Sequence, residues 1–137
     1  MVSTQDLQNF MASEFPGFKS RIDEVAPNYC KLTRLVDQSD LRPGGTVSGP
    51  TMMELADTAL YVAVLATVGL IPLAVTSNLH VHFLRKPEAG VNLVGVCRLH
   101  KVGKTQAVGS VEIYSEGSES SDGMVCHASG TYVIPRA

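Results

Sequence analysis

The sequence has few cysteines, no excess of positive charge and no clean membrane-spanning run. Its three cysteines, Cys30, Cys97 and Cys126, lie far apart and form no C-x-x-C pair, so neither a zinc site nor a redox pair is predicted. A reduced, cytoplasmic setting fits this usage best. Eleven Lys and Arg against thirteen Asp and Glu leave a formal charge of −2. The chain as a whole therefore attracts neither nucleic acid nor an anionic membrane, and an anionic ligand needs local cations.

The longest apolar run also falls short of a membrane span. It covers residues 59–75, reaches only the lower limit of about 17 residues, and is interrupted by Gly69 and Pro72. A buried helix followed by a strand explains it better. The first ten residues show no basic region followed by an apolar stretch, so no secretory signal is expected.

The composition is that of one folded domain. The chain has 137 residues, of which 45% are hydrophobic and 18% charged, so we expect a single domain over residues 1–137. Within it, residues 1–28 are predicted to form an N-terminal helical extension, with a helix over 3–15 that Ser3 caps. The remaining predicted elements are a strand at 29–36, a helix at 51–68 and strands at 73–84, 91–101, 104–115 and 124–134, the last four as an antiparallel meander.

The helix at 51–68 dominates the predicted architecture. Pro50 suits a first helical turn, and the second half, LYVAVLATV, is apolar on every side, so protein must surround it. The later strands carry Gly95, Gly109 and Gly130 on one face, which predicts a hollow in the sheet. The fold class is therefore α+β, with a curved antiparallel sheet wrapped around one long central helix.

Asp57 is the first candidate for chemistry, because an ionised carboxylate inside an enclosed helix is costly without compensation. A purely structural role, with hydrogen bonds to Thr58, Tyr61 or loop amides, is about equally plausible from the residues alone. Glu54, one turn earlier, is explained by the favourable interaction of acidic groups with a helix N-terminus.

The segment at 41–50, LRPGGTVSGP, leads directly into this helix. A helix N-terminus offers unpaired N–H groups and the positive end of a dipole, which suits an oxyanion or a phosphate. Pro50 has no N–H, so the useful amide belongs to Gly49 or to residues after Pro50.

Four segments in order resemble one family: SGPTMMELADTALYVAVLA, AVTSNLHVHFLRKP, KVGKT and HASGTYVIP. They are similar to the hotdog-fold acyl-CoA thioesterases of the phenylacetate-degradation (PaaI-like) type in the 4-hydroxybenzoyl-CoA thioesterase superfamily. The resemblance covers residues 30–135. It implies that Asp57 is the catalytic carboxylate, as general base or nucleophile, and that the Gly49 amide holds the oxyanion. It also implies that a hydroxyl at Thr76 orients the carboxylate or water.

The sequence departs from the family pattern near the helix start. Ser48 replaces the usual His, Pro50 replaces the second Gly, and Arg42 stands where relatives often carry Asn or Gln. Arg42 is counted among the catalytic residues, since it could polarise a carbonyl. Alternatively it could pair with Asp57 and weaken it as a base.

The resemblance also implies residues that contact the substrate and its coenzyme A. Arg85–Lys86 and Lys101–Lys104 end successive strands, about 30 Å apart if those strands form a hairpin. One subunit therefore cannot bring both cationic groups to one phosphate. The groups are either ordinary solvated strand ends, or they bind the coenzyme A nucleotide near a subunit boundary, each from a different chain. The resemblance favours the second, with a site between protomers in a dimer, itself paired into a dimer of dimers. The predicted contacts are Ser48, Ser77, Asn78, Arg85, Lys86, Gly103, Lys104 and Thr105.

The predicted function is hydrolysis of small or medium acyl-CoA thioesters, with coenzyme A as part of the substrate and no other cofactor. His80 and His82 share a strand face but lack a third ligand, so no metal is expected. The alternatives are a non-catalytic acyl-CoA binding module and, third, a hydratase or dehydratase. A hydratase or dehydratase usually needs a His beside its catalytic acid. No His lies near Asp57 in the sequence, so folding would have to bring His80, His82 or His127 close to it.

Overall fold

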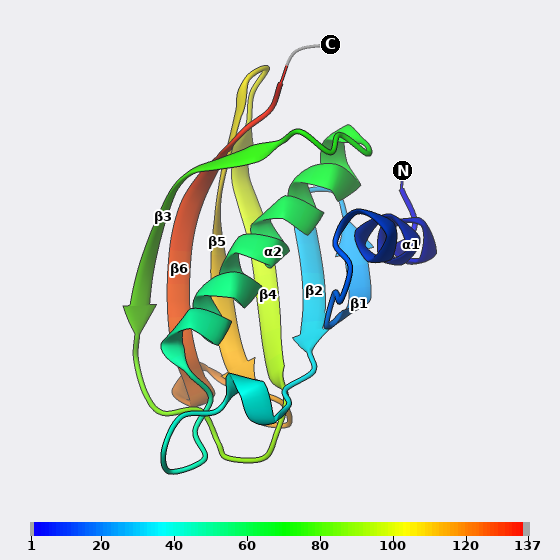
Figure 1. Cartoon of the computed structure of the whole chain (residues 1–137). Helices are drawn as coiled ribbons and strands as arrows, with labels where there is room; N and C mark the ends of the chain where they lie inside the picture. Colours follow the sequence, from blue (N-terminus) through cyan, green and yellow to red (C-terminus); the bar gives the residue numbers. More distant parts are fainter. Residues whose placement is uncertain (1, 136–137) are drawn as a thin grey trace.

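The computed structural model describes residues 2–135 and contains two α-helices, two short 3-10 helices and six strands (Figure 1). The elements, in chain order, are α1 (Thr4–Glu14), β1 (Ser20–Ala26), β2 (Tyr29–Arg34), η1 (Gln38–Asp40), α2 (Gly49–Val68), β3 (Val75–Phe83), β4 (Leu93–Val102), β5 (Gln106–Ser115), η2 (Ser121–Gly123) and β6 (Met124–Val133).

The strands form one antiparallel sheet in the order β1-β2-β4-β5-β6-β3. Helix α2 lies across one face of the curved sheet, and α1 lies beside β1 at the edge (Figure 1). The predicted fold class, a curved antiparallel sheet around one long helix, is confirmed.

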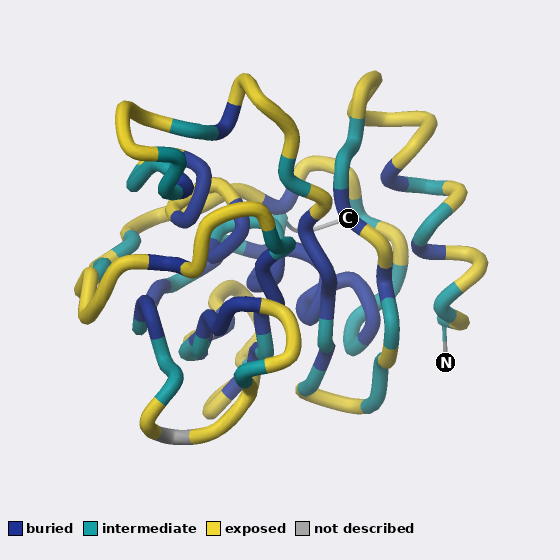
Figure 2. The backbone as a smooth tube through the Cα atoms, turned by 90° about the horizontal axis from the view of Figure 1, so that it is seen from below, coloured by how far each residue is buried: buried dark blue, intermediate teal, exposed yellow. Residues whose placement is uncertain are grey.

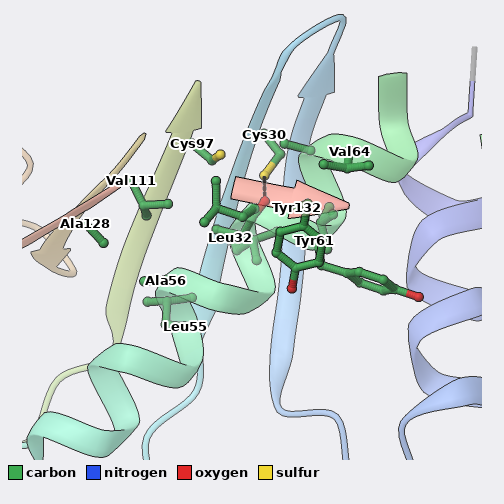
Figure 3. Close-up of a cluster of buried hydrophobic side chains, with 14 of the residues drawn as sticks. Cys30, Leu32, Leu55, Ala56, Tyr61, Val64, Cys97, Val111, Ala128 and Tyr132 are labelled. Carbon is green, nitrogen blue, oxygen red and sulfur yellow. Dashed lines mark hydrogen bonds between the residues drawn. The ribbon is translucent and has the colours of Figure 1, made fainter. Parts of the chain in front are cut away.

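Glycines on the sheet make room for the helix. A Cβ atom added to Gly95 would lie 3.2 Å from Cγ of Leu55, and one added to Gly130 would lie 2.9 Å from Cδ1 of Leu60. Real Cβ atoms hardly ever come within 3.0 Å of another heavy atom, and the one on Gly130 would also lie 2.8 Å from the Asn78 carbonyl oxygen of β3, so a larger residue there would force the backbone to shift. Figure 3 shows Leu55 within the cluster between helix and sheet, where the Cys30 thiol donates a hydrogen bond to the Ala59 carbonyl. The hollow that the sequence predicted is therefore filled by α2.

The two halves of α2 differ in burial. Residues 59–66 are all buried, as predicted from the apolar run, whereas Met53 and Glu54 are exposed and Asp57 and Thr58 are half-buried. Figure 2 shows buried backbone in the centre of the molecule and exposed backbone in the peripheral loops. Helix α2 is long and apolar enough to cross a bilayer, but 67% of its most apolar window is buried inside the fold. It is the core helix.

Two expectations about organisation are wrong. Residues 20–26, expected within an N-terminal helical extension, form the edge strand β1, because β2 offers a free edge with which they pair. Strand β3 does not pair with β4 in a meander. It crosses to the opposite edge and pairs with β6, so only β4, β5 and β6 are a meander.

Candidate active site

A cavity of about 740 Å³ opens beside the middle of α2. Its floor carries Asp57, and its walls combine apolar side chains with a few polar groups. The wall comes from α1, the α1–β1 loop, α2, the α2–β3 loop, the start of β3 and the ends of β2 and β6. Among the lining residues are Met11, Phe15, Phe18, Lys19, Arg34, Glu54, Tyr61, Pro72, Ala74, Thr76 and Tyr132. Asp57 is therefore not enclosed as the sequence predicted, since the sheet covers only one side of this half of the helix.

Two hydroxyl groups hold the carboxylate of Asp57. Thr76 Oγ1 donates to Asp57 Oδ1 at 2.5 Å, and the Tyr132 hydroxyl donates to the same oxygen at 2.8 Å. Thr76 and Tyr132 are directly paired across β3 and β6, so their side chains leave the sheet on the same face. A register shift between Thr76 and Asn78 follows at once, which turns the rest of β3 by one residue.

Thr76 thus lies where the resemblance places its supporting hydroxyl, whereas Tyr132 was not predicted. Tyr132 is 4% exposed, and burial and the neighbouring Asp57 carboxylate raise its pKa well above the ordinary value. The sequence did contain a signal for it. Tyr132 continues the inward face that Ala128 and Gly130 mark on the last strand, and a tyrosine there brings a polar group into an apolar face.

Gly49 borders a different hollow, of about 700 Å³, at the N-terminus of α2. Arg42, Phe83, Arg85 and Lys86 line it as well. A Cβ atom on Gly49 would lie 3.4 Å from the Phe83 ring, an ordinary van der Waals contact, so the helix start lies beside Phe83.

The first turn of α2 leaves the Gly49 amide available. The Thr51 amide donates to Ser48 Oγ, the Met52 amide donates to the Ser48 carbonyl, and Pro50 has no N–H. Within residues 2–135 the Gly49 amide makes no hydrogen bond. Among the amides that we considered at the start of this helix, the Gly49 amide is therefore the one available to accept an oxyanion as ligand.

Asp57 and Gly49 do not face one cavity within a single chain. They are eight residues apart on one helix, which is about 12 Å along its axis. Arg42 lines the hollow of Gly49 and not the cavity of Asp57, so the alternative in which Arg42 pairs with Asp57 is not formed within this chain.

An ion network that sequence reasoning missed fixes the loop before α2. Arg34, at the end of β2, forms a bidentate salt bridge with Asp40, with N–O distances of 3.0 and 3.1 Å. Its Nε also donates to Glu54 at 2.7 Å. Asp40 in turn accepts from Thr51 Oγ1 at 3.2 Å, and its carbonyl accepts the Ser48 amide at 2.8 Å. The network therefore positions the residues on both sides of Gly49.

The network also changes the ionisation of its members. Burial opposes the charge on Arg34, but its bonds to Asp40 and Glu54 outweigh this and raise its pKa. Burial would raise the pKa of Asp40, but the Asp37 amide and the Arg34 guanidinium lower it overall. Both groups are therefore charged near neutral pH, as a buried, hydrogen-bonded pair requires.

The predicted coenzyme A contacts lie in three places: at the start of α2, at the β4–β5 turn, and on the edge strand β3. Ser48 caps α2, and Arg85 and Lys86 line the hollow at the same end. Gly103, Lys104 and Thr105 form the exposed β4–β5 turn at the opposite end of the sheet (Figure 1). Ser77 and Asn78 are exposed on β3. One chain thus keeps the two cationic ends apart, as predicted, although β3 and β4 are not hairpin neighbours.

The histidines lie away from Asp57. His80 and His82 alternate with Leu79 and Val81, which pack on the core, so both rings point to the outer face of the sheet. His127 pairs with His82 on that same outer face. In the part of the chain that the structure describes, no group of three or more His, Cys, Asp or Glu could hold a metal ion.

The sequence profile of the Thioesterase superfamily matches residues 44–121. This is more than half of the chain, and it includes the start of α2, Asp57 and Thr76, so the protein belongs to this superfamily. No curated protein matches the chain.

Solved structures support the same assignment. A crystal structure of a candidate thioesterase from Silicibacter sp. TM1040 is 40% identical, has a TM-score of 0.90, and the match covers 99% of this chain and 94% of that one. Zebrafish thioesterase superfamily member 2 is 16% identical with a TM-score of 0.84, covering 98% and 100% of the two chains. The PaaI protein of the E. coli phenylacetic acid degradation operon is 19% identical with a TM-score of 0.78, covering 98% and 96%. The last two likenesses concern the fold, which is the hotdog fold, and superfamily membership supports thioester hydrolysis as the general activity.

Proposed function

We propose that the protein hydrolyses small or medium acyl-CoA thioesters at a site shared by two subunits. Asp57 of one protomer acts as general base toward water or attacks the thioester carbonyl itself. The Gly49 amide of the partner subunit binds the developing oxyanion. The proposal needs no cofactor beyond the coenzyme A of the substrate.

The observation that carries this proposal is the division of the chemistry between two hollows. Asp57 lies in a cavity whose apolar part, with Met11, Phe15 and Phe18, suits an acyl group, although Lys19, Arg34 and Glu54 also line it. The free Gly49 amide lies with Arg42, Arg85 and Lys86, which suit phosphate oxygens. Because about 12 Å along the helix separates Gly49 from Asp57, one thioester carbonyl cannot reach both within a chain. A twofold axis beside the edge strand β3 would reverse the partner and bring its Gly49 end to this cavity.

The surface beside β3 fits such a dimer. Strand β3 is an edge strand, with backbone groups open to pairing. Val75, Phe83 and the exposed Met53 of α2 add apolar surface on this side. A dimer with two equivalent sites follows, and a dimer of dimers is the assembly we propose for the whole protein.

The chemistry follows from these positions. Water, activated by proton transfer to Asp57, adds to the thioester carbonyl, and the Gly49 amide stabilises the oxyanion. Collapse of the intermediate breaks the C–S bond, and the thiolate of coenzyme A leaves and takes up a proton. In the nucleophilic variant Asp57 forms an anhydride with the acyl group, which water then hydrolyses. Thr76 holds the carboxylate in both cases.

The test compares wild type with Asp57→Asn on a panel of acyl-CoA substrates, with release of free thiol as the readout. We expect kcat to fall about 10²- to 10⁴-fold, because amide replaces carboxylate at the same volume. Glu112→Gln is the matched control, since Glu112 lies on the outer face of the sheet. It should retain wild-type turnover.

The outcomes separate the candidate functions. Turnover that Asp57→Asn leaves intact would remove Asp57 from the chemistry. An acyl-CoA binding module would bind the panel with equal affinity in both proteins and release no thiol. A mixture of Asp57→Asn with a Gly49→Val variant should regain activity by forming one intact site per mixed dimer, and no recovery would contradict a shared site.

A further inference from the structure

The carboxylate of Asp57 is bound on one oxygen only. Oδ1 accepts from both Thr76 and Tyr132, and in the described part of the chain no hydrogen bond reaches Oδ2. The Tyr132 hydroxyl also lies 3.2 Å from the backbone carbonyl oxygen of Asp57, so it bridges the side chain and the backbone of the same residue. The two carboxylate oxygens are therefore not equivalent.

We propose that Tyr132 is a positioning residue for catalysis, which together with Thr76 fixes Oδ1 of Asp57 and leaves Oδ2 as the oxygen that reacts. The inference rests on the proposed thioesterase function. It adds a residue on β6 to the site and assigns separate tasks to the two oxygens of the carboxylate.

The surroundings of Tyr132 make it a rigid donor. Tyr132 is 4% exposed, and its ring centroid lies 5.9 Å from that of Tyr61. Both side chains are labelled in Figure 3. The Tyr61 hydroxyl donates to the Pro72 carbonyl. Pairing with Thr76 across the sheet fixes its backbone. A buried side chain that packs beside Tyr61 on a paired strand loses little further freedom when it binds Asp57, so the hydrogen bond has a defined direction.

Tyr132 also remains a donor over the working pH range. Burial and the adjacent carboxylate raise the pKa of its hydroxyl, so Tyr132 stays protonated near neutral pH. A carboxylate with one bound oxygen keeps its plane fixed, and the unbound oxygen can take a proton from water without rotating away.

The experiment uses Tyr132→Phe in the full chain. It removes one oxygen and preserves the ring, and we expect kcat to fall about 10- to 100-fold while KM stays within about two-fold. Tyr114→Phe is the matched control: Tyr114 is also buried, and its hydroxyl donates to a carboxylate, Glu112, away from the cavity. It should retain wild-type kcat. Thermal midpoints of both variants report on folding.

The same assay includes Asp57→Asn, which distinguishes a failure of the proposed thioesterase function from a failure of the positioning role of Tyr132. If Asp57→Asn abolishes turnover and Tyr132→Phe keeps wild-type kcat, the positioning role is wrong and the proposed function stands. If Asp57→Asn is fully active, the proposed function fails first. A rise in KM at constant kcat, or an equal loss in Tyr114→Phe, would also overturn the positioning role.

Discussion

The two halves of helix α2 have opposite surroundings, although they form one continuous helix. In the second half, residues 59–66 are all buried, although Tyr61 also lines the cavity of Asp57. In the first half, only one face packs on the sheet, and the other exposes Met53 and Glu54 and presents Asp57 to a cavity. The closed half stabilises the fold, and the open half presents its acidic side chain to the cavity.

The difference determines how each half is held. Apolar contacts such as those of Leu60 with Gly109 and Gly130 secure the closed half. The open half has less apolar surface to bury, and charged hydrogen bonds from Arg34 through Asp40 to Thr51 anchor its start. Substitutions should therefore affect the two halves differently.

The largest expected effect on stability is that of Arg34→Met, which breaks the anchor of the open half. Arg34 and Asp40 are 6% and 5% exposed, so the change leaves a buried carboxylate without its cation. We expect a loss of about 3–5 kcal/mol in the free energy of unfolding, measured by urea denaturation. Turnover should fall as well, because the loop that carries Gly49 loses its support.

Arg98→Met provides the control. Arg98 pairs with Glu112 at 3.5 Å on the outer face, and its side chain is largely exposed. The same chemical change there should cost at most about 1 kcal/mol. Equal losses in the two variants would contradict the anchoring role of Arg34.

Leu60→Ala tests the closed half. Leu60 fills the hollow over Gly109 and Gly130, so truncation leaves a cavity that the sheet cannot close. We expect a loss of about 2–5 kcal/mol in the free energy of unfolding, with kcat unchanged while the protein is folded. Leu70→Ala, at an exposed position just after the helix, should change stability by less than about 0.5 kcal/mol. A selective loss of kcat in Leu60→Ala would show that the two halves are not separate in function.

The smallest expected effect is a loss of stability at low pH through Asp37, which lies in the loop between β2 and α2. Lys19 contacts Asp37 at 2.7 Å and, with the Ser39 hydroxyl and amide, lowers the pKa of Asp37 to about 2. Because the folded pKa lies below the unfolded one, Asp37 stabilises the fold above the unfolded value and loses this contribution as pH falls through the folded one. Thermal midpoints of wild type and Asp37→Asn should differ at about pH 5 and converge near pH 2. A difference that persists unchanged at low pH would exclude this linkage.

Local patterns were sufficient to predict much of the fold. Pro50 and the apolar run that follows predicted α2 to within two residues of its start, and Gly69 predicted its end. Gly95, Gly109 and Gly130 predicted the hollow, because glycine has no side chain to fill the space above the sheet. Since side chains alternate between the two faces of a strand, the positions of these glycines also predicted which face is hollow. The roles of Asp57, Gly49 and Thr76 stay predictions, although Asp57 and Thr76 do meet in the structure.

Contacts between distant segments were not predictable. Tyr132 reaches Asp57 across 75 residues of sequence, and Arg34 reaches Glu54 across 20. Neither pair has a local motif, since an isolated Arg or Tyr fits a solvated or core position equally well. Strand β1 was missed because its pattern is short and irregular, and the place of β3 depends on which edge of the sheet remains unpaired.

By itself, the sequence determined most of the elements, with β1 the exception, together with the enclosed half of the central helix and the presence of an acidic group on that helix. These follow from periodicity, glycine placement and the cost of burying charge. Only the tertiary structure decided which face of the helix stays open, which hydroxyls bind Asp57, and that Gly49 and Asp57 border different cavities. These depend on strand order and on contacts between distant segments, which no local segment of the sequence specifies.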